Sequence, residues 1–194
     1  MLGDYIDYIG DIGSNGSNEV VAKNLKMLDS EDYALMIRTT NLTSNDFTKN
    51  VKYISKETYD FFKKSKIYGG EIIMNKIGSA GDFWIMPNLN RPVSLGLNQF
   101  VIRLKDLNTM YLFYYLSSNY GRALIKSNLN GAVTKSITKL AVKELPLIYP
   151  ALDKQMKFEQ EISILNKLKQ KITISHSETL FQSLLQQAFK GELT

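Results

Sequence analysis

Glu71-Ile72-Ile73-Met74-Asn75 is a short apolar run with a polar residue at each end, and it predicts a buried strand. Gly78-Ser79-Ala80-Gly81 then predicts a turn, and Asp82-Phe83-Trp84-Ile85-Met86 predicts the strand that returns from it. Similar runs predict further strands over 33–38, 51–54 and 99–104. Together these runs indicate a mixed sheet inside one globular domain.

Helical signals separate these strands, so the expected fold class is α+β. Ser55 has the character of an N-cap, and we expect a short helix after it that ends in Lys63, Lys64 and Lys66. Residues 109–118 and 121–127 predict two buried helices. Residues 1–32, rich in Gly, Asn and Ser, predict a short entry element followed by loop, and Thr39-Thr40-Asn41 also predicts a loop.

A second unit is expected after the proline-bounded segment 145–150, which gives domains over 1–150 and 151–194. Proline holds its predecessor out of the helical region, so 145–150 predicts an extended exit. Residues 152 to 190 predict one long helix of about 58 Å. Its apolar positions fit two registers displaced by two residues, which favours a coiled coil with a stagger. The expected dimerisation residues are Leu165, Leu168, Ile172, Phe181 and Leu184.

The composition narrows the class of protein. The 194 residues are 44% hydrophobic and 22% charged, which is typical of a chain with a packed core. The absence of cysteine excludes a disulfide scaffold, a thiolate zinc site and a cysteine nucleophile. No apolar run reaches the roughly 18 residues of a membrane span, and the N-terminus has no signal-peptide character. We therefore expect a cytoplasmic protein with no membrane partner.

Positive charge is concentrated in the middle of the chain. The net charge is +5 overall, but it is −5 over residues 1–46 and +9 over residues 47–150. A block of this kind is a candidate nucleic-acid footprint. The alternative is a lysine-rich surface that is merely solvated.

Residue constellations that support catalysis are missing from the sequence. Gly10, Gly13 and Gly16 are not followed by the Gly-Lys-Ser/Thr of a phosphate loop, so we interpret them as turn residues. Glu71 and Lys76 lack the further acidic residues of a metal-dependent nuclease site. A methyltransferase motif of the Asn-Pro-Pro-Tyr type is absent. We therefore expect a non-catalytic binding module with no cofactor and no metal.

Several stretches in a fixed order resemble one protein family. They are Leu35-Met36-Ile37-Arg38-Thr39-Thr40-Asn41-Leu42, Tyr68 to Gly81, Ser94-Leu95-Gly96-Leu97-Asn98-Gln99-Phe100, Gly131 to Gln155, and Phe189-Lys190-Gly191-Glu192-Leu193. This order resembles the specificity subunit of type I restriction–modification systems over nearly the whole chain. The exit segment departs from the family's usual Pro-Pro-Leu-x-Glu-Gln, because it reads Tyr149-Pro150-Ala151-Leu152-Asp153-Lys154-Gln155.

The resemblance implies a role and partners. It implies a target recognition domain that reads double-stranded DNA, a helix that spaces it from a second recognition domain, and methylation and restriction subunits as partners. The full subunit has two recognition domains and two helices, so this chain resembles a half subunit. It implies a homodimer or a pairing with a second half subunit, and a bipartite DNA target.

Candidate DNA contacts follow from residue chemistry. Base-edge readers have forked or amide side chains at strand ends and loops. We expect this role for Arg38, Asn41, Asn75, Lys76, Asn98 and Gln99, with Thr40 beside them. Phosphate contacts are expected from Lys49, Lys52, Lys63, Lys64, Lys66, Lys126, Lys135 and Lys139, with Thr134 and Ser136 as further donors.

A second hypothesis belongs to another class. The chain would then be a structural protein that oligomerises through its coiled coil, and its basic surface would be incidental. Salt-sensitive binding to duplex DNA with a sequence preference distinguishes the two hypotheses.

Overall fold

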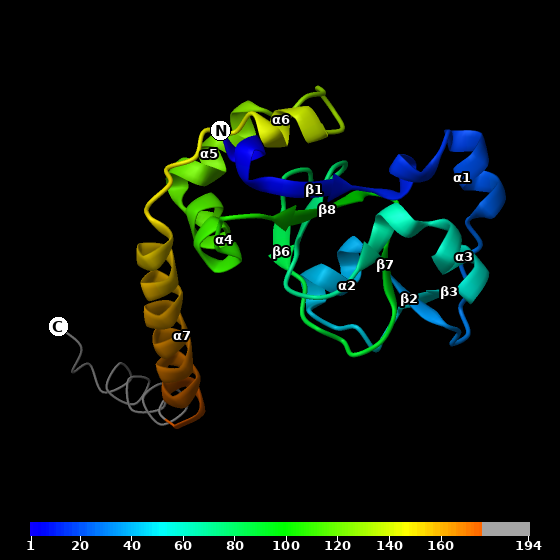
Figure 1. The fold of residues 1–194 in the computed structure, drawn as a ribbon. Helices are drawn as coiled ribbons and strands as arrows, with labels where there is room; N and C mark the ends of the chain where they lie inside the picture. Colours follow the sequence, from blue (N-terminus) through cyan, green and yellow to red (C-terminus); the bar gives the residue numbers. More distant parts are fainter. Residues whose placement is uncertain (176–194) are drawn as a thin grey trace, which may run out of the picture. The chain divides into compact units, whose positions relative to one another are not determined.

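The structure is a computed structural model that describes residues 1–175, with side chains described as far as residue 168. The chain forms two compact units, Met1–Tyr149 and Pro150–Thr194. The first unit holds two four-stranded sheets with short helices around them, which is the α+β class expected (Figure 1). The part of the second unit that the structure describes, residues 150–175, contains one long helix.

Two sheets organise the first unit. Sheet A is antiparallel and has the order β1 (Ile6–Gly10), β8 (Gln99–Leu104), β5 (Ile72–Asn75), β6 (Phe83–Ile85). Sheet B has the order β3 (Lys52–Ile54), β2 (Ala34–Ile37), β7 (Val93–Leu95), β4 (Lys66–Ile67). Its central pair, β2 and β7, is parallel and its outer pairs are antiparallel, so the sheet is mixed as expected.

The helices of the first unit are short. The α-helices are α1 (Asn18–Asn24), α2 (Thr39–Ser44), α3 (Lys56–Phe61), α4 (Thr109–Ser117), α5 (Asn119–Ser127) and α6 (Lys139–Lys143). The 3-10 helices are η1 (Leu2–Tyr5), η2 (Ile12–Asn15) and η3 (Lys63–Ser65). Ser55 caps α3 as expected, because its Oγ accepts a 3.2 Å hydrogen bond from the N–H of Thr58.

The central strands are apolar on both faces because each sheet is covered twice. In β5, Ile73 packs toward sheet B, whereas Ile72 and Met74 pack with residues of α4, α5 and α6. In β2, Leu35 packs toward sheet A, whereas Met36 packs with residues of α1 and α3. Successive side chains of a strand point to opposite faces, so a strand covered on both sides needs a continuous apolar run. The layers are therefore helices, sheet A, sheet B, helices (Figure 1).

Several expectations about local structure were wrong. Residues 1–32 form β1, η2 and α1 rather than mainly loop. Thr39-Thr40-Asn41 begins α2 rather than a loop, because the Asn41 Oδ1 accepts the N–H of Arg38 at 3.1 Å and stabilises the first turn. The segment from Lys63 to Lys66 leaves the helix for η3 and β4. The strand β7 and the helix α6 were not expected.

The second unit contains α7 (Leu152–Ser175), which begins at the residue expected. Of the predicted seam, Leu165 and Leu168 are about half exposed. Ile172 lies in the helix beyond the described side chains, and Phe181 and Leu184 lie outside the described residues. Over the described part of the chain, no helix combines the length and the apolar character needed to cross a membrane.

Candidate nucleic-acid interface

The predicted DNA contacts gather in a few places on the first unit. We name three of them by their residues. The Asp11 cluster is Asp11, Ser14, Lys76 and Lys139; the η3 lysines are Lys63 and Lys64. The Gln99 pocket contains Arg38, Thr40, Asn98 and Gln99 from the predicted set.

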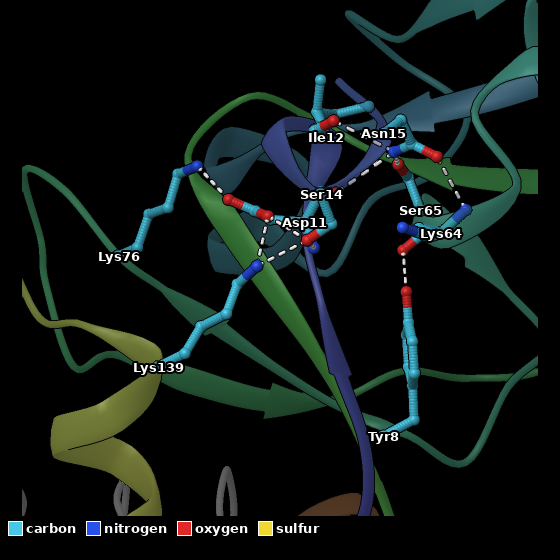
Figure 2. A network of polar contacts seen from close by, with 9 residues as sticks. All are labelled: Tyr8, Asp11, Ile12, Ser14, Asn15, Lys64, Ser65, Lys76 and Lys139. Atoms are coloured by element: carbon cyan, nitrogen blue, oxygen red, sulfur yellow. Dashed lines mark hydrogen bonds and ion pairs between the residues drawn. The ribbon is translucent and has the colours of Figure 1, made fainter. Parts of the chain in front are cut away.

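Asp11 holds two of the predicted lysines (Figure 2). It follows β1 directly and starts η2, and its carboxylate is buried. The Oδ2 accepts from the Lys76 Nζ at 2.5 Å, and the Oδ1 accepts from the Lys139 Nζ at 2.7 Å and from the Ser14 Oγ at 2.6 Å. Burial by itself raises the pKa of Asp11, but the hydrogen bonds from Lys139, Lys76 and Ser14 together outweigh it and lower the pKa to about 2.

Asn15, at the end of η2, positions the η3 lysines. The Asn15 Nδ2 donates to the Ser65 Oγ at 2.8 Å, and the Asn15 Oδ1 accepts from the N–H of Lys64 at 2.9 Å (Figure 2). The hydroxyl of Tyr8 donates to the carbonyl of Lys64 at 2.6 Å. The backbone of η3 is thereby fixed, while the side chains of Lys63 and Lys64 are exposed. Within the described residues neither ammonium has an ion-pair partner.

Lys66 differs from the η3 lysines because its ammonium is already in an ion pair. Its Nζ lies 3.0 Å from the Asp60 Oδ1 and 4.1 Å from the centroid of the Tyr59 ring. Glu71 is likewise occupied: it accepts from the Arg103 Nε at 3.2 Å and from the N–H of Gly69 at 2.6 Å. The Glu71–Lys76 pair of a nuclease site is therefore not formed, since Lys76 pairs with Asp11.

A loop with three predicted residues lies next to the end of β5. The carbonyl of Lys76 accepts from the N–H of Ile137 at 2.9 Å, and the carbonyl of Lys135 accepts from the N–H of Gly78 at 3.1 Å. The Lys135 Nζ donates to the carbonyl of Gly131 at 2.7 Å. Thr134 is exposed and Ser136 is half-buried. The backbone contacts therefore bring this loop to the Lys76 side of the Asp11 cluster.

The Gln99 pocket has a volume of about 260 Å³ and opens between β2, α2 and the loop before β8. Its lining residues are Met27, Met36, Arg38, Thr39, Thr40, Lys52, Gly96, Leu97, Asn98 and Gln99. The Gln99 Nε2 donates to the Thr39 Oγ1 at 3.0 Å, and that hydroxyl donates to the Asn75 Oδ1 at 2.8 Å. Arg38, Asn98 and Gln99 therefore line one pocket. Asn75 is connected to it through the Thr39 hydroxyl.

Asn41 stands apart from the other predicted base readers. It is buried, and its Nδ2 lies 3.3 Å from the carbonyls of both Asp46 and Lys49. Together with the bond to the Arg38 N–H, these contacts use its amide to hold the loop after α2. A DNA contact by Asn41 stays a prediction.

Sequence reasoning missed Asp11 and Ser14 altogether, and it missed the pocket residues Thr39, Met36 and Leu97. The usable signal for Asp11 was its place after an alternating run, Ile6-Asp7-Tyr8-Ile9, where a strand ends. Over the described residues, no group of three or more His, Asp or Glu side chains has the spacing of a metal site.

Comparisons with known proteins agree on one family. The family model described as "Type I restriction modification DNA specificity domain" matches residues 8–182. The S subunit of a type I restriction–modification system from M. genitalium has a TM-score of 0.53 and 13% identity, over 89% of this chain and 39% of that one. The HsdS subunit from Thermoanaerobacter tengcongensis has a TM-score of 0.56 and 18% identity, over 99% of this chain and 44% of that one. No match was found among curated proteins.

The two structural neighbours share the fold, and this chain spans less than half of the length of each. The family match begins within β1 and extends past the end of α7, and it includes the Asp11 cluster, the η3 lysines and the Gln99 pocket. The chain belongs to the type I restriction–modification DNA specificity domain family.

Proposed function

We propose that this chain reads a DNA sequence on behalf of a type I restriction–modification system. The family match over residues 8–182 carries the proposal. The net charge of +9 over residues 47–150 supports it, because lysine-rich surfaces supply the salt-dependent part of DNA affinity. In this role the chain works beside DNA in the cytoplasm and catalyses no step itself.

We assign two kinds of DNA contact to these residues: contacts to phosphates and contacts to base edges. The η3 lysines contact phosphates, because their backbone is fixed and their ammonium groups are exposed. Lys76 and Lys139 also contact phosphates. Each ammonium has three N–H donors and gives one of them to Asp11, so further donors remain for DNA. Lys135, Thr134 and Ser136 add phosphate contacts from the neighbouring loop. Arg38 and Asn98 make the contacts that depend on sequence.

We infer that the chain pairs through α7 with a second copy or with another half subunit. The half-exposed Leu165 and Leu168 support such a pairing. Two recognition units give a bipartite target, and methylation and restriction subunits act where the pair binds.

The helix then sets the spacing of the two half-sites. Inserting four residues after Ile172 lengthens it by about one turn, or 5.4 Å. Sequences selected by the complex with its methylation subunit should keep the same half-sites and gain one to two base pairs of spacer, at roughly 3.4 Å each. An unchanged spacer would remove the helix from this role.

The test of DNA reading is selection from a random duplex library, followed by affinity measurements on the selected and a scrambled sequence. The selected sequence should bind more tightly, and affinity should fall by about 0.9 decade per decade of salt for each phosphate neutralised. Replacing Lys63 and Lys64 by alanine should weaken binding to both sequences. The matched control replaces Lys23 and Lys26, which are exposed in the acidic segment 1–46. Equal affinity for both sequences at every salt concentration would favour the oligomerisation protein.

A further inference from the structure

The Gln99 pocket has the composition of a site for one flat, polar-edged group. Met27 and Leu97 stand at its rim, 46% and 45% exposed, and Met36 is fully buried behind them. Gln99 and Thr39 supply its polar end, and Arg38 adds positive charge, whereas the Lys52 ammonium is already paired with the Asp29 carboxylate. A volume of about 260 Å³ is below that of pockets for drug-sized ligands and suits a single ring system.

Two buried polar atoms of the pocket-lining residues have no hydrogen-bond partner among the described residues. Gln99 is 1% exposed, and its Oε1 has no hydrogen-bond partner among the described residues. Arg38 also lines the pocket, and its Nε is buried without a hydrogen-bond partner among the described residues. The Nη2 of the same guanidinium donates to the carbonyl of Asn50. Buried polar atoms in proteins are nearly always hydrogen-bonded, so an acceptor and a cationic donor left open in one pocket mark a binding site.

Gly96 lies directly beside the Gln99 Oε1. A Cβ at position 96 would lie 2.9 Å from that oxygen and 2.5 Å from the carbonyl oxygen of Ile37. Any side chain there would therefore collide with the end of β2 and cover the free acceptor.

We infer that the pocket receives one nucleotide whose base has left the DNA stack. An exocyclic amino group of the base donates to the Gln99 Oε1, the apolar side chains of Met27 and Leu97 contact the ring, and the Arg38 Nε donates to an acceptor on the edge of the same base. A base inside a duplex presents only its groove edges, so an acceptor buried this deeply is reached only by an extruded base. The inference rests on the proposed function, and it makes Gln99 a specificity-determining residue.

The same chemistry fits a free nucleotide, so the experiment has two arms. In the first arm, the selected duplex carries 2-aminopurine at each purine and pyrrolocytosine at each cytosine, one position at a time. Fluorescence of these analogues rises when they leave the stack, and the pocket lining contains no aromatic ring to quench it. In the second arm, deoxynucleoside monophosphates are titrated into the protein without DNA.

The expected result is a several-fold fluorescence rise at one position of the selected duplex. Gln99→Leu should abolish the preference for the natural base there, a loss of about 5- to 150-fold in discrimination. Leu97→Ala should reduce the rise as well, and its exposure makes it harmless to folding. The matched control is Leu140→Ala, which is 63% exposed in α6 and outside the pocket. Thermal melting of each variant checks that it is folded.

The other outcomes are equally decisive. Sequence-specific binding with no brightened position would overturn the inference and leave the proposed function standing. If the protein shows no sequence preference, the proposed function fails, and the second arm decides: saturable nucleotide binding that Gln99→Leu removes assigns the pocket to a free nucleotide. Absence of binding in both arms would overturn any nucleotide role.

Discussion

The Asp11 cluster and the Gln99 pocket are both polar sites at strand ends of the first unit, but they differ in how completely their polar atoms are satisfied. Both oxygens of Asp11 accept hydrogen bonds, and Lys139 bonds Ser14 at 2.5 Å as well. In the pocket, the Gln99 Oε1 and the Arg38 Nε have no partner among the described residues, and behind it the Asn75 Nδ2 has none either. The first site is built to hold segments of chain together, and the second is built to bind something else.

The largest effect on stability is expected at the satisfied site. Asp11→Asn removes the charge that Lys76 and Lys139 share, and leaves two partly buried ammonium groups beside a neutral amide. Breaking such a group should lower the free energy of unfolding by about 2–4 kcal/mol, measured by urea denaturation. Asp7→Asn is the control, because Asp7 is exposed on β1, the strand that Asp11 follows, and the substitution should change the stability little. Equal effects of the two substitutions would show that the cluster does not hold the fold.

The same contrast predicts a dependence on pH. The pKa of Asp11 is lowered to about 2 from an ordinary value of 3.8. A lowered carboxyl pKa contributes stability that is fully present above the unfolded-state value and is lost as the pH falls through the folded-state value. Between about pH 4 and pH 2 the wild-type protein should lose about 2 kcal/mol relative to Asp11→Asn. Urea denaturation of both proteins over that range measures the difference, and parallel curves would contradict it.

At the unsatisfied site the effect on stability should be smallest. Gln99→Leu removes one hydrogen bond to Thr39, but it also removes a buried oxygen that has no partner, so stability should change by less than about 1 kcal/mol. Asn41→Leu is the matched control, because the amide of Asn41 is buried and bonded on both sides. It should lose about 1–3 kcal/mol in the same denaturation experiment. A larger loss from Gln99→Leu than from Asn41→Leu would reverse the comparison.

The strands that the sequence predicted correctly are mostly those that are covered on both faces. The strands β2, β5 and β8 are apolar over consecutive residues because a sheet covers one face and helices or another sheet cover the other. β1 was missed because it is short and lies in a segment rich in Gly, Asn and Ser, and β7 because it has only 3 residues next to Pro92. α2 was missed because threonine is a weak helix former and the Asn41 contact that starts the helix is not visible in composition.

The site was harder to predict than the fold. Residue chemistry identified Arg38, Asn98 and Gln99 as candidates, and the structure gathers them at one pocket. Asp11 could not be found in this way, because its partners Lys76 and Lys139 lie 65 and 128 positions away along the chain. A carboxylate that organises distant lysines is defined by tertiary pairing, to which a single sequence gives no access.

The central claim is that the η3 lysines contact phosphates while the pocket residues respond to sequence. It is tested most directly by measuring affinity for the selected and the scrambled duplex between about 50 and 200 mM salt. Replacing Lys63 and Lys64 by alanine should weaken both duplexes alike and reduce the salt slope by about 2. Arg38→Ala should cost about 1–3 kcal/mol on the selected duplex and leave the scrambled one unchanged. If Arg38→Ala weakens both duplexes equally, or if the lysine replacements change only the selected one, the division of roles is wrong.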